Sequence, residues 1–80
     1  EVAPLIGQLR GQANRIVDSE LDRFSAKLAN LEPDERAAVE ALARGLVNKM
    51  LHEPTVRLKD AAGKARGDRL AESLRDLFDL

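Results

Sequence analysis

The 80-residue sequence has no cysteine, tryptophan or tyrosine, and it contains one histidine, one methionine and two phenylalanines. Without cysteine the chain can form no disulfide and carries no thiolate nucleophile. A single histidine argues against a zinc site, which takes four nitrogen, sulfur or oxygen ligands. The missing tyrosine and tryptophan also remove the best side chains for stacking on nucleic-acid bases. We therefore expect no metal and no catalytic centre in this sequence.

Charge of one sign and long apolar runs are also absent. Thirteen basic and fourteen acidic residues leave a net charge of −1, which gives no general reason to expect nucleic acid. No apolar stretch approaches the ~18–20 residues that cross a bilayer, and no signal peptide is visible. We expect one small domain in the cytoplasm, or in the stroma if the protein is plastidic. The sequence opens without methionine, so we expect a piece of a longer protein.

Chemical motifs are missing as well. The stretch "GKARGD" lacks the order and the preceding strand of a phosphate-binding loop, so we interpret it as a linker. Serine and threonine have no evident histidine–carboxylate relay. Most carboxylates have a basic neighbour three or four positions away, as Glu40 has Arg44, which is typical of solvated ion pairs. We expect no catalytic, cofactor-binding or metal-binding residue.

What the sequence does have is helical periodicity. From Pro4 to Leu31 the large apolar residues fall within roughly 160° of one helix circumference, which predicts a long amphipathic helix. Twenty-eight helical residues span about 40 Å, whereas a compact chain of this size has a radius of gyration near ~12–13 Å. This helix should extend beyond the rest of the fold. Its apolar stripe is then either exposed to solvent or covered by another chain.

A second helix should follow, with Pro33 in its first turn and a poor N-cap at Glu32. Its broad apolar face comprises Val39, Leu42, Leu46, Val47, Met50 and Leu51. A stripe of small and polar residues runs beside that face: Ala41, Gly45, Asn48 and His52. Small residues let another backbone approach, and polar ones can bond across the contact. For His52, capping or an interface hydrogen bond is favoured over catalysis.

Pro54 should end this helix and open a short one from Thr55 to Ala62, with Gly63 as its stop. We expect a loop over residues 63–67 and a last helix from Asp68, with Leu70, Leu74, Leu77 and Phe78 on one side. The predicted fold is all-α: one long helix over residues 1–31 and two to three shorter helices over residues 32–80. These form one structural unit, a bundle completed by dimerisation.

One segment is locally basic. Five basic and two acidic residues give residues 57–69 an excess of +3, which could contact phosphates. The candidate contacts are Arg57, Lys59 and Arg66. No helix-turn-helix pattern accompanies them, so a solvated loop is favoured over a dedicated RNA site.

Three stretches carry a family resemblance. They are "EVAPLIGQLRGQANRIVDSELDRF", the run Lys49-Met50-Leu51-His52-Glu53-Pro54-Thr55-Val56-Arg57-Leu58-Lys59, and the terminal "LRDLFDL". Together they resemble the C-terminal region of glutamyl-tRNA reductase over essentially all 80 residues. Met50 and Glu32 depart from that pattern, where leucine and a capping serine or threonine are usual, and Glu32 puts only the helix cap in doubt.

The resemblance implies a helical dimerisation domain at the end of a long spinal helix. The parent enzyme is then a V-shaped homodimer that reduces the glutamyl group of charged tRNA to glutamate-1-semialdehyde, using NADPH, at the start of tetrapyrrole (haem and chlorophyll) synthesis. Its nucleophilic cysteine and nicotinamide site belong to other domains, and none of their residues can be carried onto this sequence. The fragment itself should be non-catalytic, with no cofactor and with a second copy as its partner.

The candidate dimer interface combines the two apolar patterns with the small-polar stripe. Its residues are Leu5, Leu9, Ile16, Phe24, Leu28, Ala41, Gly45, Asn48 and His52. Two alternatives stay open: a helical module whose basic segment 57–69 binds tRNA, and a helical adaptor unrelated to the reductase.

Overall fold

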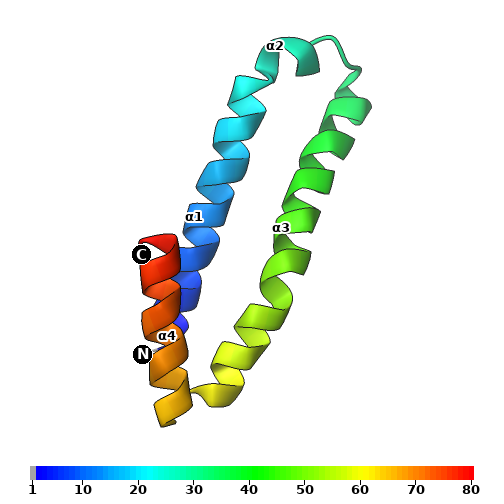
Figure 1. Cartoon of the computed structure of the whole chain (residues 1–80). Helices are drawn as coiled ribbons and strands as arrows, with labels where there is room; N and C mark the ends of the chain where they lie inside the picture. Colours follow the sequence, from blue (N-terminus) through cyan, green and yellow to red (C-terminus); the bar gives the residue numbers. More distant parts are fainter. Residues whose placement is uncertain (1) are drawn as a thin grey trace.

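The structure, a computed structural model, describes residues 2–80 and is built from helices alone over that range. In chain order the helices are α1 (Val2–Arg23), α2 (Ser25–Leu28), α3 (Pro33–Ala61) and α4 (Ala65–Phe78) (Figure 1). The all-α prediction is therefore confirmed. The longest helix is α3, with 29 residues, rather than the first one.

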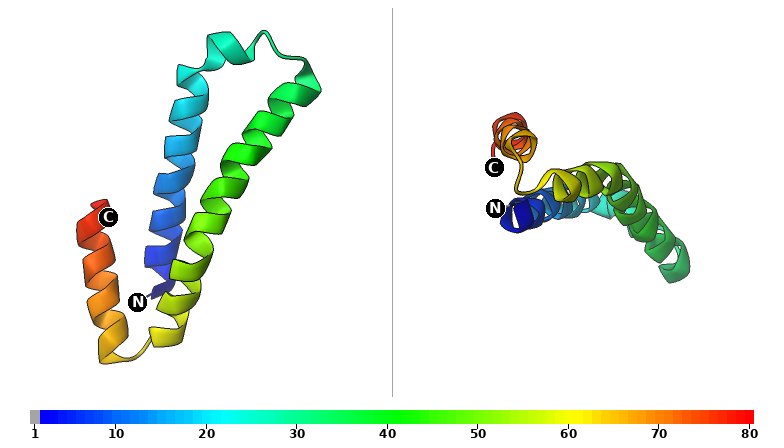
Figure 2. Two further views of the ribbon diagram at one scale, coloured as in Figure 1. Left: turned by 45° about the vertical axis from the view of Figure 1, so that its right-hand side comes forward. Right: turned by 90° about the horizontal axis from the view of Figure 1, so that it is seen from below.

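The helices form an open hairpin with a short third arm. α1 and α3 run antiparallel, joined at one end by α2 and the turn that follows it (Figure 1). α4 folds back beside the other end of the hairpin, so three helices meet there and only two elsewhere (Figure 2). The molecule measures 51 × 20 × 15 Å, with a radius of gyration of 15.8 Å, against about 12 Å for a compact chain of this length. The chain is therefore elongated, but the length comes from the α1–α3 hairpin, because the first helix ends at Arg23 and the longer α3 lies beside it instead of leaving it to overhang the fold.

The core lies mainly at the three-helix end. Seven apolar side chains are buried: Leu5, Ile6, Leu9, Val17, Leu58, Ala61 and Ala71. Six of them come from the start of α1, the end of α3 and the first half of α4, where the helices converge. The other end of the hairpin adds little buried area, because two helices cannot enclose a side chain on all sides.

Polar contacts tie the three long helices together. Arg10 of α1 donates to Asn48 Oδ1 of α3 at 3.1 Å, and Arg44 of α3 donates to Asp18 Oδ1 of α1 at 2.7 Å. Gln12 donates to the backbone carbonyl of Phe78, at 2.7 Å, and so links α1 to the end of α4. These exposed contacts link helices whose shared apolar area is small.

The predicted first helix to Leu31 is interrupted, which corrects its C-terminal boundary. α1 ends at Arg23, and Phe24 has φ −99° and ψ 11°, outside the ideal helical range. A single turn, α2, follows and bends the chain toward α3 (Figure 1). In the bent chain Leu28 and Leu31 are both half-buried.

The prediction that Pro54 ends the second helix is wrong. α3 begins at Pro33, where the backbone N–H of Glu32 donates to Glu35 Oε1 at 2.9 Å, and it continues through Pro54 to Ala61. Proline removes one backbone hydrogen bond and crowds the preceding turn, at a cost of about 3 kcal/mol. Continuing the helix, however, buries Leu58 and Ala61 at 4% and 1% exposure. The core contact outweighs the local cost.

The last helix begins earlier than predicted. Ala65, Arg66 and Gly67 already belong to α4, so the connection from α3 is only residues 62–64 rather than a loop over 63–67. Gly63 takes a φ of +81° at this corner. α4 then packs Gly67 and Ala71 inward.

Candidate interaction surface

An unusual share of the large apolar side chains is open to solvent. Exposed fractions are 58% for Ile16, 42% for Phe24, 63% for Leu42, 57% for Leu46, 76% for Met50, 38% for Val56, 81% for Leu77 and 43% for Phe78. Single exposed apolar residues are normal on any protein, but grouped ones mark interaction sites. The question is which of these form a group.

Three of them form a line along α3, which we call the outer stripe: Leu42, Leu46 and Met50. They are spaced four residues apart, so they lie on neighbouring turns of one side of the helix. The opposite side of α3 carries Leu51 and Leu58, which face the rest of the chain. Leu42 and Leu51 are nine residues apart, about 180° around a helix. α3 is therefore apolar on two opposite sides, and only one of them is covered.

The structure separates the residues predicted on the first helix. Leu5 and Leu9 are 1% and 2% exposed, so the chain's own helices cover them and no surface is left for a partner. Ile16 and Phe24 lie outside that core and are exposed, and Leu28 is half-buried. The physical reason is α4, which packs beside the first half of α1 and leaves the second half open (Figure 2).

The predicted stripe of small and polar residues is not a uniform open surface. Asn48 accepts the hydrogen bond from Arg10, so its amide is directed toward α1. Ala41 and His52 are exposed, while Gly45 is half-buried with open space at the position of a side chain. These four remain predicted interface residues. In a dimer, Asn48 would contact the partner and still accept the hydrogen bond from Arg10.

The basic segment is divided between different faces. Arg57 and Lys59 are two residues apart on α3 and therefore point to different sides. Arg57 and Arg66 do share a groove of about 450 Å³ between α3 and α4, lined also by Glu53, Pro54, Leu58, Leu70 and Leu74. Arg57 lies 3.7 Å from Glu53 Oε1, beyond hydrogen-bond range. The positive charge is thus spread rather than gathered into one patch.

The ion pairs are of the exposed kind. Arg23 donates to both carboxylate oxygens of Glu20, at 3.0 and 2.7 Å, and this hydrogen bonding lowers the pKa of Glu20. The hydrogen bond to Asp18 raises the pKa of the Arg44 guanidinium. Neither arrangement places a carboxylate in a pocket where it could act as a general acid or base. Across residues 2–80, no group of three histidine, cysteine or carboxylate side chains is placed to hold a metal ion.

Comparison with known proteins fits this geometry. A sequence family described as "Glutamyl-tRNAGlu reductase, dimerisation domain" matches residues 1–80. The chain belongs to this family. The resemblance carried by the Lys49–Lys59 run is therefore confirmed, and so is the assignment of these residues to the dimerisation domain of glutamyl-tRNA reductase.

Relatives of this dimerisation domain cover the whole chain. Glutamyl-tRNA reductase of Frankia casuarinae is 47% identical over 79 residues, which is 99% of this chain and 17% of that protein. The reductase of Thermobifida fusca is 43% identical, again over 99% of this chain and 17% of its own length. That of Chloroflexus aggregans is 41% identical over the full chain and 18% of its length. The chain thus spans less than a fifth of these relatives, and no solved structure matches it.

For a dimerisation domain, the outer stripe is the surface that the sequence-based candidate set left out. The sequence places Leu42, Leu46 and Met50 on the broad apolar face of the second helix, and the predicted interface does not include them. The available signal was the width of that face: apolar residues on opposite sides of one helix cannot all face a single neighbour. Within the described residues, none of the helices is long and apolar enough to span a membrane.

Proposed function

We propose that this chain holds two copies of a longer glutamyl-tRNA reductase together as a homodimer. The supporting observation is the exposed apolar surface of the hairpin. Its main part is the outer stripe of α3, whose side chains are 57–76% exposed. Only seven apolar side chains are buried among the described residues. The large apolar side chains that stay exposed add nothing to the stability of a single chain. The family is described as a dimerisation domain, which indicates a second copy of the chain as the partner.

The energetics are adequate for such a contact. Fully burying a leucine or methionine side chain stabilises by ~1.5–3 kcal/mol. Six stripe side chains from two copies, already partly covered, then supply roughly 5–10 kcal/mol. Association costs about 4–15 kcal/mol of translational and rotational freedom. The contact must therefore extend past the stripe, and Ile16 and Phe24 offer further exposed area.

The activity of the whole protein is part of the same proposal. The parts outside these residues would bind NADPH and charged tRNA and reduce the glutamyl group to glutamate-1-semialdehyde, for porphyrin and haem synthesis in the cytoplasm. In that arrangement this chain contributes no reacting group. It sets how far apart the two catalytic arms stand.

The mass of the chain in solution tests the homodimer. Light scattering at micromolar concentration should give twice the chain mass of 8.8 kDa. Leu42→Asp should reduce the mass to that of one chain, because the side chain is 63% exposed in the monomer and its charge would be buried only in a dimer.

Leu9→Asp provides the contrast. This side chain is 2% exposed, so aspartate should unfold the chain and abolish its helical circular dichroism rather than merely dissociate it. A wild-type mass of one chain at 100 µM or so would exclude the proposal.

A second candidate function is contact with tRNA through the basic segment. The observation in its favour is that Arg57 and Arg66 line the same groove. If this groove binds RNA, Arg66→Glu in the full enzyme should weaken tRNA binding and lower its salt dependence. Lys27→Glu, at the far end of the hairpin, is the matched charge reversal. Equal affinities for all three proteins would dismiss the RNA contact.

A further inference from the structure

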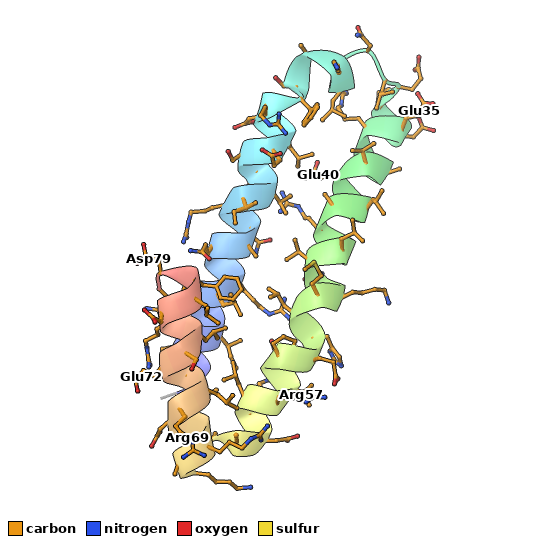
Figure 3. All side chains as sticks on the ribbon, viewed as in Figure 1. Glu35, Glu40, Arg57, Arg69, Glu72 and Asp79 are labelled. Atoms are coloured by element: carbon orange, nitrogen blue, oxygen red, sulfur yellow. The ribbon has the colours of Figure 1, made fainter. Side chains whose placement is uncertain are left out.

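The outer stripe of α3 is nearly symmetric about Leu46. Leu42 and Met50 lie four residues to either side, and Glu35 and Arg57 lie eleven residues to either side. On a helix, four and eleven residues correspond to rotations of about 40° and 20°, so all five positions share a sector of roughly 80°. Glu35 and Arg57 stand near opposite ends of α3 (Figure 3).

We propose that a second copy of the chain docks on this stripe through its own α3, antiparallel, with Leu46 beside the twofold axis. This inference rests on the proposed homodimer and specifies which face and which orientation form it. In such a twofold contact, a residue and its partner have numbers that add up to 92. Leu46 meets Leu46, Leu42 lies beside Met50, and Glu35 lies beside Arg57, each from the two different copies.

The charges select the orientation. In the antiparallel pair, Glu35 of each copy lies beside Arg57 of the other, and this attraction is opposed only where Asp60 falls beside Glu32 near the ends of the two helices. A parallel pair would place Glu35 against Glu35 and Arg57 against Arg57, which is repulsive at both ends. The side chain of Arg57 is available for this role, since its closest acidic partner in the chain, Glu53, is 3.7 Å away and both groups are about two-thirds exposed.

The distances are compatible with this pairing. Helices in bundles cross at ~20° with axes 8–10 Å apart. Glu35 and Arg57 lie about 16 Å along the axis from Leu46, so at that crossing the ends diverge by only about 6 Å, within reach of these long side chains. At the centre, directly opposed Cα atoms come within about 4–5 Å of each other.

Cysteine cross-linking tests the register cleanly, because the native chain has no cysteine. A disulfide needs Cα atoms ~4.4–6.8 Å apart. Leu46→Cys should therefore oxidise readily to a covalent dimer. Leu42→Cys and Met50→Cys should cross-link poorly alone but well when the two variants are mixed. Leu77→Cys, which is 81% exposed on α4, is the control and should stay monomeric on denaturing gels.

A charge exchange tests the orientation. Arg57→Glu should weaken the dimer by about tenfold, since it loses two attractive pairs and gains two repulsive ones. Combining it with Glu35→Arg should recover most of the affinity in sedimentation equilibrium. Circular dichroism of each variant separates this effect from unfolding, because Glu35 also bonds to the backbone N–H of Glu32.

A dimer that cross-links through Leu46→Cys and through the mixed pair supports the inference. A dimer that cross-links instead through Ile16→Cys or Phe24→Cys, and not through Leu46→Cys, overturns the α3 contact while the homodimer stands. A chain that stays monomeric at every concentration removes both.

Discussion

Two of the five glycines are required by the corner between α3 and α4. Gly63 has a φ of +81°, a backbone conformation that costs other residues about 1–2 kcal/mol. Gly67 is buried, and a Cβ there would overlap the carbonyl group of Ala61, coming within 2.8 Å of its carbon. The first turn of α4 can pack on the end of α3 only because residue 67 has no side chain. Gly7, in contrast, lies in the first half of α1, and a Cβ there would have open space around it.

Gly67→Ala should therefore destabilise the chain by about 1–3 kcal/mol, since the obstacle is backbone and cannot rotate away. Gly7→Ala is the matched control and should stabilise by about 0.5–1 kcal/mol, because alanine loses less conformational freedom in a helix. Urea unfolding followed by circular dichroism measures both. Equal stabilisation by the two substitutions would show that the close approach at residue 67 does not constrain the corner.

At the scale of the element, α3 illustrates how tertiary contact overrides a local rule. Proline inside a helix normally ends it, and the sequence contains a suitable stop at Gly63 for a separate short helix. The residues after Pro54 include Leu58 and Ala61, which are 4% and 1% exposed against α1 and α4. Their burial depends on the helix keeping its direction through the proline.

Leu58→Ala tests this account. Truncating a buried leucine costs about 2–5 kcal/mol, and here it should also free the segment after Pro54 to fray. We expect faster amide hydrogen exchange in residues 55–61 than in the first half of α3. Val56→Ala is the control on the same turn, at 38% exposure, and should cost under about 1 kcal/mol. Uniform exchange along α3 in the Leu58 variant would mean that Pro54 is not a weak point.

The periodicity of apolar residues was enough to predict an all-α chain and an amphipathic first helix. On α4 it grouped Leu70 and Leu74, which are half-buried, with Leu77, which is 81% exposed. It could not locate the break at Phe24 or the start of α4 at Ala65, because both depend on where another helix lies. The same limit applies to the surface. Leu9 and Leu42 look alike in sequence, yet the chain's own helices cover Leu9 and leave Leu42 open. Periodicity identifies an apolar side of a helix, but only the packed structure shows whether the chain itself covers it.

At the scale of the whole molecule, stability is unevenly distributed. Most of the core lies where the three helices meet (Figure 2). Toward the hairpin end, with α2, the side chains of Ile16, Phe24 and Leu42 are exposed. A domain of about 80 residues is already close to the size at which a single core is marginal. Covering the hairpin with a second copy would supply the missing burial, so association and folding should be coupled.

Coupled association predicts that thermal stability depends on concentration. For a dimer that unfolds to two chains, each tenfold rise in concentration adds about 1.4 kcal/mol, or roughly 3–5 °C in Tm for a unit of twice this size. Scanning calorimetry at about 5, 50 and 500 µM should reveal that rise. Leu46→Asp should lower Tm at high concentration and remove the dependence, because a charge at a residue 57% exposed in the monomer is costly only inside a dimer. A wild-type Tm that stays constant over this hundredfold range would mean that each chain is stable by itself. Burial of the hairpin end by a partner would then contribute nothing to that stability.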